Sequence, residues 1–260
     1  MNTTVRSAAA GAGNHGLLEK GARLGYAASG LLHLLIAFVA LQLAWSTGAQ
    51  EASQSGALQT LGSSGPGSVA LWVMVVGLAL LGVWQLTEAA VLRETGDRLK
   101  AAGKGVVYLV LAWTAFGVAR GSGSGGGSDQ TSTMTASLME KPFGLVLVGA
   151  VGVGIVAIAV YHVHKGWKKT FLGDLVAHPG TWVVRAGRAG YIARGIALGI
   201  VGVLLVSAAV THDPAQSQGL DGALRTLLDA PFGKLLLTLV ALGFAAFGVY
   251  SFARARYARV

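Results

Sequence analysis

Six long apolar stretches, nearly free of charged residues, constrain the fold of this chain more than any other feature. A helix that crosses the hydrocarbon core of a membrane needs roughly 20 mostly apolar residues. Charged residues make up only 12% of the sequence, against about a quarter in soluble domains. The sequence therefore predicts an all-α integral membrane protein with six transmembrane helices. The predicted spans are 24–45, 68–87, 103–119, 143–164, 195–210 and 235–253.

The segments between the spans carry less information. Residues 1–16 are polar and lack an apolar core, so we expect a disordered N-terminal tail and no cleavable signal sequence. Residues 121–128 consist only of glycine and serine, which predicts a flexible linker. The chain has no cysteine, which excludes disulfides, thiolate metal sites and cysteine nucleophiles.

Basic residues gather on one side of the predicted spans. Most of the 20 Lys and Arg residues lie in the two termini and in the loops after the second and fourth spans. Positive loops stay in the cytoplasm, so both termini are expected there. This topology also accounts for the net charge of +9 without a nucleic-acid partner.

Three consecutive two-helix repeats organise the sequence, with boundaries at 17–97, 98–170 and 187–260. Each unit crosses the membrane twice, so the copies share one orientation about an axis along the membrane normal. We therefore expect a pseudo-threefold ring of helical hairpins. The matching motifs are ARLGYAASG at 22–30 and GRAGYIARG at 187–195, PFG at 142–144 and 231–233, and GVW, AVY and GVY at 82–84, 159–161 and 248–250.

A short amphipathic segment precedes the last span. Leu220, Leu224, Leu227 and Leu228 share one helical face, and Asp221 is placed to cap that helix. Residues 56–61 match residues 222–227. A short helix on the outer membrane surface is the expected structure.

These motifs resemble the DUF1206 family, a bacterial family of unknown function whose members are tandem copies of a two-helix unit. The resemblance covers residues 17–257, although the second copy has Ala101 where the opening motif has tyrosine. It implies the repeat fold and a place in the bacterial cytoplasmic membrane, but no activity.

Two sets of charged residues occupy equivalent positions in the repeats. Arg23, Arg98 and Arg188 lie near the cytoplasmic ends of the odd spans, where they either anchor the helices or contact anionic lipids. Glu88, Lys165 and Arg254 each follow an exit aromatic by four residues. They are either snorkelling side chains or an inter-repeat ion-pair network at the cytoplasmic mouth.

Few polar residues lie at mid-membrane, and His33 and Gln42 are the candidates for a midplane site. No catalytic motif or matched histidine pair is present, so we expect no enzyme activity, no cofactor and no metal. A membrane scaffold, or a protein that binds a partner or lipid, is the favoured function. The alternative is a transporter or channel for a small solute or ion, with a central cavity between the repeats.

Overall fold

The computed structural model describes residues 3–46, 57–59, 62, 65–91, 94–120, 127–176 and 180–257, and nearly all of them are helical. Six of the described helices are long and apolar enough to cross a membrane, as predicted. They are α1 (Thr3–Trp45), α3 (Gly65–Val91), α4 (Thr95–Ala119), α6 (Gly144–Trp167), α7 (Thr181–Thr211) and α9 (Gly233–Tyr257). The shorter elements are α5 (Gly127–Met139), α8 (Gly219–Asp229) and the 3-10 turns η1 (Thr170–Asp174) and η2 (Pro214–Gln216).

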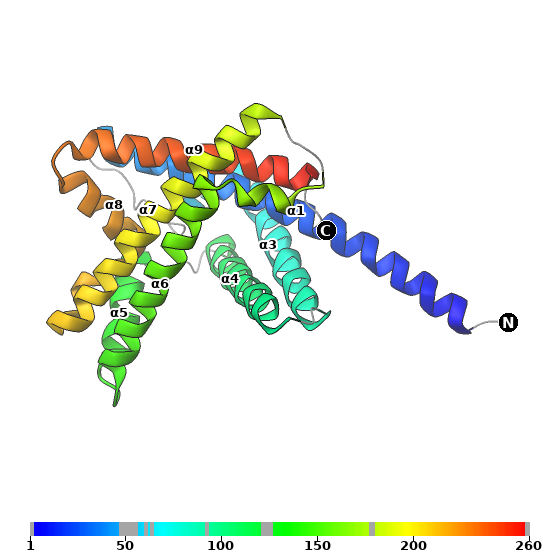
Figure 1. Ribbon diagram of the computed structural model, residues 1–260, viewed down its shortest axis with the longest axis horizontal. Helices are drawn as coiled ribbons and strands as arrows, with labels where there is room; N and C mark the ends of the chain where they lie inside the picture. The colour runs from blue at the N-terminus through cyan, green and yellow to red at the C-terminus, as the bar shows by residue number, and fades with distance from the viewer. Residues whose placement is uncertain are drawn as a thin grey trace.

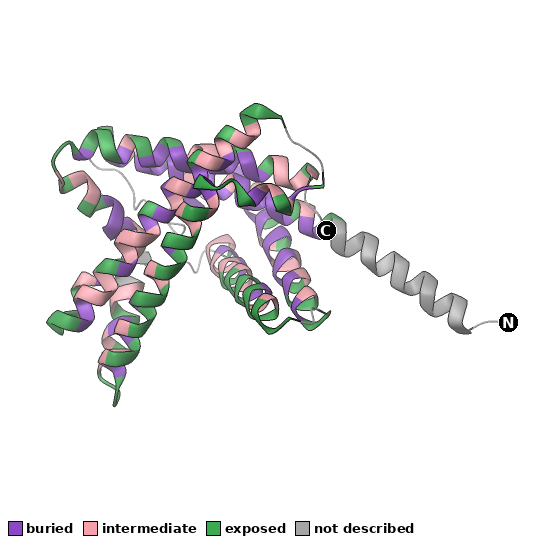
Figure 2. Ribbon diagram, viewed as in Figure 1, coloured by how far each residue is buried: buried purple, intermediate pink, exposed green. Residues whose placement is uncertain are grey.

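The long helices carry many exposed residues (Figure 2), and large apolar side chains are frequent among them. Trp113 is 75% exposed, Val160 64% and Val203 59%. In water such a surface would be strongly unfavourable, whereas lipid is as apolar as these side chains. The described helices therefore have the surface of a multi-pass membrane protein.

Three helices begin eight or more residues earlier than the apolar pattern indicated. α1 begins at Thr3, so a helix occupies most of the segment predicted to be a disordered tail. The alanines at 8–10 are strong helix formers, and the span that follows supplies the helix nucleus. α4 begins at Thr95 with Asp97 in its first turn, where a negative charge favours the helix N-terminus. α7 begins at Thr181, and its helical backbone runs through Arg185, Arg188 and Arg194 before it reaches the predicted span.

The predicted short helix before the last span is α8, with Leu224 fully buried on its inner face. Asp221 is not its cap, which corrects the prediction. Gln218 occupies the N-cap position, and Asp221 Oδ2 instead accepts a hydrogen bond from Arg225 Nε at 2.7 Å. Asp221 lies in the first turn, three positions past the N-cap, which is too far into the helix to cap it.

The second repeat has a short helix of its own, α5, which the sequence did not predict. Its first residues, Gly127 and Ser128, belong to the segment predicted as a flexible linker, and residues 121–126 lie outside the described residues. α5 contacts α8 and the start of α6. The sequence analysis missed α5 because the Ser- and Thr-rich sequence of this helix lacks the periodic apolar residues by which a helix is recognised.

The long helices pack in the order α4, α3, α1, α9, α7, α6 (Figure 1). Three of the contacts join neighbouring repeats: α3 with α4, α6 with α7, and α9 with α1. Within repeats, α1 packs on α3 and α7 on α9, but α4 and α6 make no extensive contact over the described residues. We call the end where α3, α6 and α9 finish the basic end, because most arginines and lysines lie there.

The three contacts between repeats use equivalent small residues. A Cβ on Gly30 would lie 3.0 Å from the carbonyl oxygen of Gly248, and one on Gly82 would lie 3.1 Å from that of Gly105. A Cβ on Gly195 would lie 2.8 Å from the carbonyl oxygen of Ala159. Small residues let helix backbones approach closely in lipid. In all three places, the first helix of one repeat (α1, α4 or α7) therefore packs on the end of the second helix of a neighbouring repeat (α9, α3 or α6, respectively).

Candidate functional site

Charged side chains from several helices meet at the basic end of the bundle. Lys104 on α4 interacts electrostatically with Lys165, Arg254, Asp174 and Glu88. These five residues are the basic-end cluster, with three cations and two carboxylates. Tyr26 on α1 and Tyr191 on α7 lie against it, so all six long helices contribute to the site.

Over the described residues, Lys165 and Asp174 form the one ion pair of this cluster. Lys165 Nζ lies 2.8 Å from Asp174 Oδ2, and its ammonium group lies 5.5 Å from the ring centroid of Tyr191. The Lys165 side chain is only 12% exposed. Water and salt screen a shielded pair of this kind less than one at an open surface.

Asp174 reaches Lys165 because Phe171 fixes the turn η1. Phe171 is fully buried, with its ring 5.3 Å from that of Tyr191 and 5.1 Å from that of Tyr250 between centroids. The Tyr250 hydroxyl also donates a hydrogen bond to the Phe171 carbonyl oxygen at 3.4 Å. The turn between the second and third repeats is thus anchored in an aromatic core.

Arg254 has aromatic neighbours in place of a carboxylate. Its guanidinium carbon lies 4.3 Å from the ring centroid of Tyr26, a cation–π contact. Its Nε is buried and has no hydrogen-bond partner among the described residues. Within the same part of the chain, no carboxylate lies within 4.0 Å of it. Arg254 therefore keeps an unused donor inside the cluster.

The predicted network of Glu88, Lys165 and Arg254 is placed differently from the expectation. All three lie in the cluster, but Lys165 pairs with Asp174. The strongest charge–charge interaction of Glu88 is with Lys104. Among the described residues, no ion pair joins Glu88 directly to Lys165 or Arg254. Lys104 lies among all of these groups.

Several polar residues around the cluster were missed by the sequence reasoning, although the repeat register contains their signal. Gln85, His162 and Ser251 each directly follow an exit aromatic. Gln85 and Ser251 are buried, Gln85 Oε1 has no described partner, and His162 interacts with Lys104, Lys165 and Arg194. In the first helix of each repeat (α1, α4 and α7), the residue directly before the close-packed glycine is also polar: these residues are Ser29, Lys104 and Arg194. Comparing each repeat position for polarity would have found both sets.

The arginines predicted to contact lipids lie in three different settings. Arg23 Nη1 donates to the carbonyl oxygen of Arg256 at 3.1 Å, which joins α1 to the end of α9. Arg98 is exposed. The guanidinium of Arg188 lies 5.0 Å from the ring centroid of Trp167 on α6.

The predicted midplane residues His33 and Gln42 do not form one site. His33 is buried, its Nδ1 lies 2.7 Å from the Ser29 carbonyl oxygen, and its ring is 4.6 Å from that of Phe247. Gln42 is half-buried nine positions further along α1, which is about 14 Å at 1.5 Å per residue. His33 therefore packs between helices as an ordinary hydrogen-bonded core residue.

These features define a class: helical multi-pass membrane proteins built from three two-helix repeats, with a charged cluster where the repeats meet. The chain belongs to the family described as Domain of Unknown Function (DUF1206), whose model matches residues 24–91, 99–169 and 189–258. It is 33% identical over 257 residues to the uncharacterized protein YxxB of Bacillus subtilis (strain 168), covering 92% of this chain and 91% of that protein. No solved structure matches the chain.

Proposed function

We propose that this is a non-enzymatic membrane protein that binds a phosphate-type anion in the basic-end cluster. The observation that carries the proposal is Arg254, whose buried Nε has no hydrogen-bond partner in the described part of the chain, while the two carboxylates of the cluster interact with Lys165 and Lys104. A cation in a poorly hydrated site is strongly stabilised by a counter-charge. An anion held by Arg254 would supply it.

The type of anion follows from the donors. Arginine presents a planar fork of N–H groups that matches phosphate or carboxylate, and lysine binds phosphate as a point charge. Lys104 interacts electrostatically with both Arg254 and Lys165, so a ligand with more than one negative charge fits better than a single carboxylate. This narrows the lipid- or partner-binding function expected from the sequence.

The proposal includes a pseudo-threefold arrangement of the repeats with the basic end in the cytoplasm of a bacterium. The equivalent pairs Gly30–Gly248, Gly105–Gly82 and Gly195–Ala159 support the threefold relation. The abundance of Lys and Arg at the basic end supports the orientation. The cluster would then draw its anion from the cytoplasm or from the inner leaflet.

Replacing Arg254 with glutamine is expected to weaken binding of inorganic phosphate at least tenfold. A hydrogen bond to a charged group contributes about 1.5–3 kcal/mol, or about 10- to 100-fold in affinity. Isothermal titration calorimetry on the protein in a neutral detergent measures the effect.

Arg256→Gln is the matched control, because Arg256 is an exposed arginine two residues further along α9. It should leave the affinity for phosphate within twofold of wild type. Equal weakening in both variants, or no phosphate binding by the wild-type protein, would contradict the proposal.

The orientation has a simple test because the chain contains no cysteine. A single cysteine at Ser137, which is exposed on α5, should react with a membrane-impermeant maleimide on intact cells. One at Lys168, exposed at the basic end, should react only after the cells are opened. The reverse pattern would place the basic end outside.

Transport of the anion is the second candidate. A set of polar residues lies at a single equivalent position of the three repeats, deeper in the bundle than the cluster: Gln85, His162 and Ser251. Gln85 Oε1 is buried and has no hydrogen-bond partner among the described residues. Such polar groups are what a solute pathway needs. Phosphate flux in liposomes that falls in Arg254→Gln but not in Arg256→Gln would favour transport over binding alone.

A further inference from the structure

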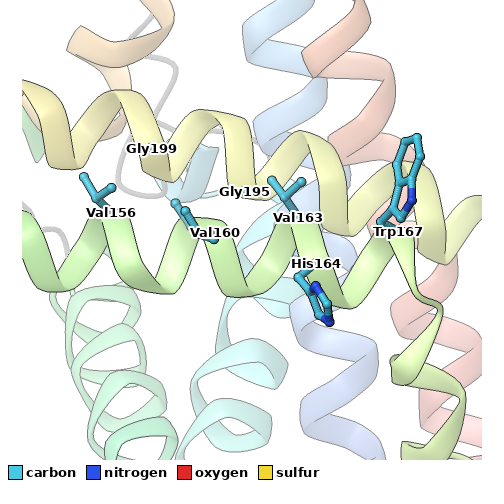
Figure 3. A pocket seen from close by; sticks show the side chains of 8 residues that line it. Val156, Val160, Val163, His164, Trp167, Gly195 and Gly199 are labelled. Atoms are coloured by element: carbon cyan, nitrogen blue, oxygen red, sulfur yellow. The ribbon is translucent and has the colours of Figure 1, made fainter.

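An apolar groove runs along the surface between α6 and α7 (Figure 3). Its volume is about 460 Å³, and no residue of the basic-end cluster lines it. The lining residues are Val156, Ala159, Val160, Val163, His164, Trp167, Gly195 and Gly199. Val160 and Trp167 are 64% and 62% exposed, so the groove opens outward from the helix pair.

The groove exists because its floor lacks side chains. α7 contributes only Gly195 and Gly199, and α6 contributes Ala159 between the valines. A Cβ on Gly199 would lie 3.7 Å from the Ala159 Cβ, which is ordinary contact, so a larger residue would extend into the groove. The walls and floor offer little except apolar surface until His164.

The length and position of the groove match one leaflet of a membrane. From Val156 to Trp167 it follows α6 for eleven residue steps, or about 16 Å at 1.5 Å per residue. The hydrocarbon core is about 30 Å thick. The groove therefore covers roughly the half of the core that adjoins the basic end, the depth reached by one acyl chain.

Cations surround the basic end of the groove. Arg188 lies with its guanidinium 5.0 Å from the Trp167 ring centroid. Lys168 is exposed directly after Trp167. Tryptophan is typical of the depth at which lipid headgroups begin, and nearby lysine and arginine attract anionic headgroups.

We propose that the groove binds an anionic phospholipid, with one acyl chain against Gly199 and Val160 and its phosphate beside Arg188 and Lys168. The site is independent of the phosphate site at Arg254, because the two share no residue. The apolar floor favours a lipid acyl chain, and the positive charges at the basic end of the groove favour a negatively charged headgroup.

Filling the groove with Gly199→Leu is expected to reduce bound phosphatidylglycerol at least fivefold. The measurement is native mass spectrometry of the protein in neutral detergent with added phosphatidylglycerol or phosphatidylcholine. Gly154→Leu is the control, because a Cβ there meets nothing within 4 Å and Gly154 does not line the groove. The control should bind as the wild type does.

The headgroup contact has its own pair of variants. Arg188→Gln should lower phosphatidylglycerol binding at least threefold and leave the weaker phosphatidylcholine binding unchanged. Arg185→Gln should change neither, although Arg185 also stacks on a tryptophan, with its guanidinium 5.4 Å from the Trp182 ring centroid. Equal binding of the two lipids by the wild type, or undiminished binding by Gly199→Leu, overturns the proposal. If Gly199→Leu does not fold, Trp167→Ala replaces it: this variant removes the side chain that lines the basic end of the groove, and it should also reduce phosphatidylglycerol binding.

Discussion

Substitution of Gly190 by valine is expected to lower the melting temperature of the detergent-solubilised protein by about 6–12 °C. A Cβ on Gly190 would lie 2.6 Å from the Cα and 2.7 Å from the backbone nitrogen of Phe247. Backbone atoms cannot rotate away, so α7 and α9 would have to separate. Overpacking of this kind costs up to about 3 kcal/mol, and each kcal/mol shifts the melting temperature by about 2–4 °C in a chain of similar size.

The separation of α7 and α9 should also disturb the aromatic core that fixes η1. Phe247, Tyr191, Tyr250 and Phe171 pack together there, and Tyr191 lies directly after Gly190. Gly154→Val is the control, since its Cβ meets nothing within 4 Å on the exposed face of α6. Its melting temperature should stay within about 2 °C of wild type, because a surface substitution changes stability by about 0.5 kcal/mol. Similar losses in both variants would mean that the close α7–α9 approach does not limit stability.

The second large effect is expected at the turn into the last helix, in Gly233→Ala. A Cβ on Gly233 would overlap the carbonyl oxygen of Leu228, and it would lie 2.8 Å from that of Leu227. The hydrogen bond from Gly233 N to the Ala230 carbonyl oxygen, 2.8 Å long, would break as the turn opened. We expect a loss of about 2–4 kcal/mol, in the range of other strained or overpacked substitutions.

Hydrogen–deuterium exchange would locate the damage, with amides of α8 exchanging at least tenfold faster in Gly233→Ala. The second repeat provides an internal replicate. A Cβ on Gly144 would overlap the Leu138 carbonyl oxygen, and the preceding Phe143 and Phe232 share a left-handed backbone with φ of 64° and 60°. Gly144→Ala should therefore loosen α5 in the same way. Gly103→Ala, where a Cβ meets nothing within 4 Å, should leave both short helices protected.

Much of the architecture could be predicted because a span must be apolar along its length. Apart from the cap residue Phe143, the six predicted stretches lie within helices, and the repeat motifs correspond to shared turns such as the left-handed phenylalanines. The starts of α4 and α7 were missed because charged residues interrupt the N-terminal part of each helix, Asp97 in α4 and Arg185 and Arg188 in α7, and an apolar-run criterion removes such segments. Asp221 was misassigned by three positions, since a cap and a first-turn acid have nearly the same sequence signal.

The candidate site was predictable only in part. Glu88, Lys165 and Arg254 follow from the repeat alignment, and the structure places all three in the basic-end cluster. Asp174 does not follow, because it lies outside the matched motifs in a turn that Phe171 holds in place. The pairing of Lys165 with Asp174 therefore depends on contacts with Tyr191 and Tyr250, more than ten residues away in sequence.

The sequence by itself determined that six helices are apolar enough to lie in lipid and that they belong to three related two-helix repeats, because both properties depend on local composition and on short motifs. Only the tertiary structure decided that α4 packs on α3 and α6 on α7 across repeat boundaries. It also decided that Arg254 is left beside Tyr26 without a carboxylate among the described residues. Helix pairing in lipid depends on how closely particular surfaces fit, and that fit arises between segments far apart in the chain.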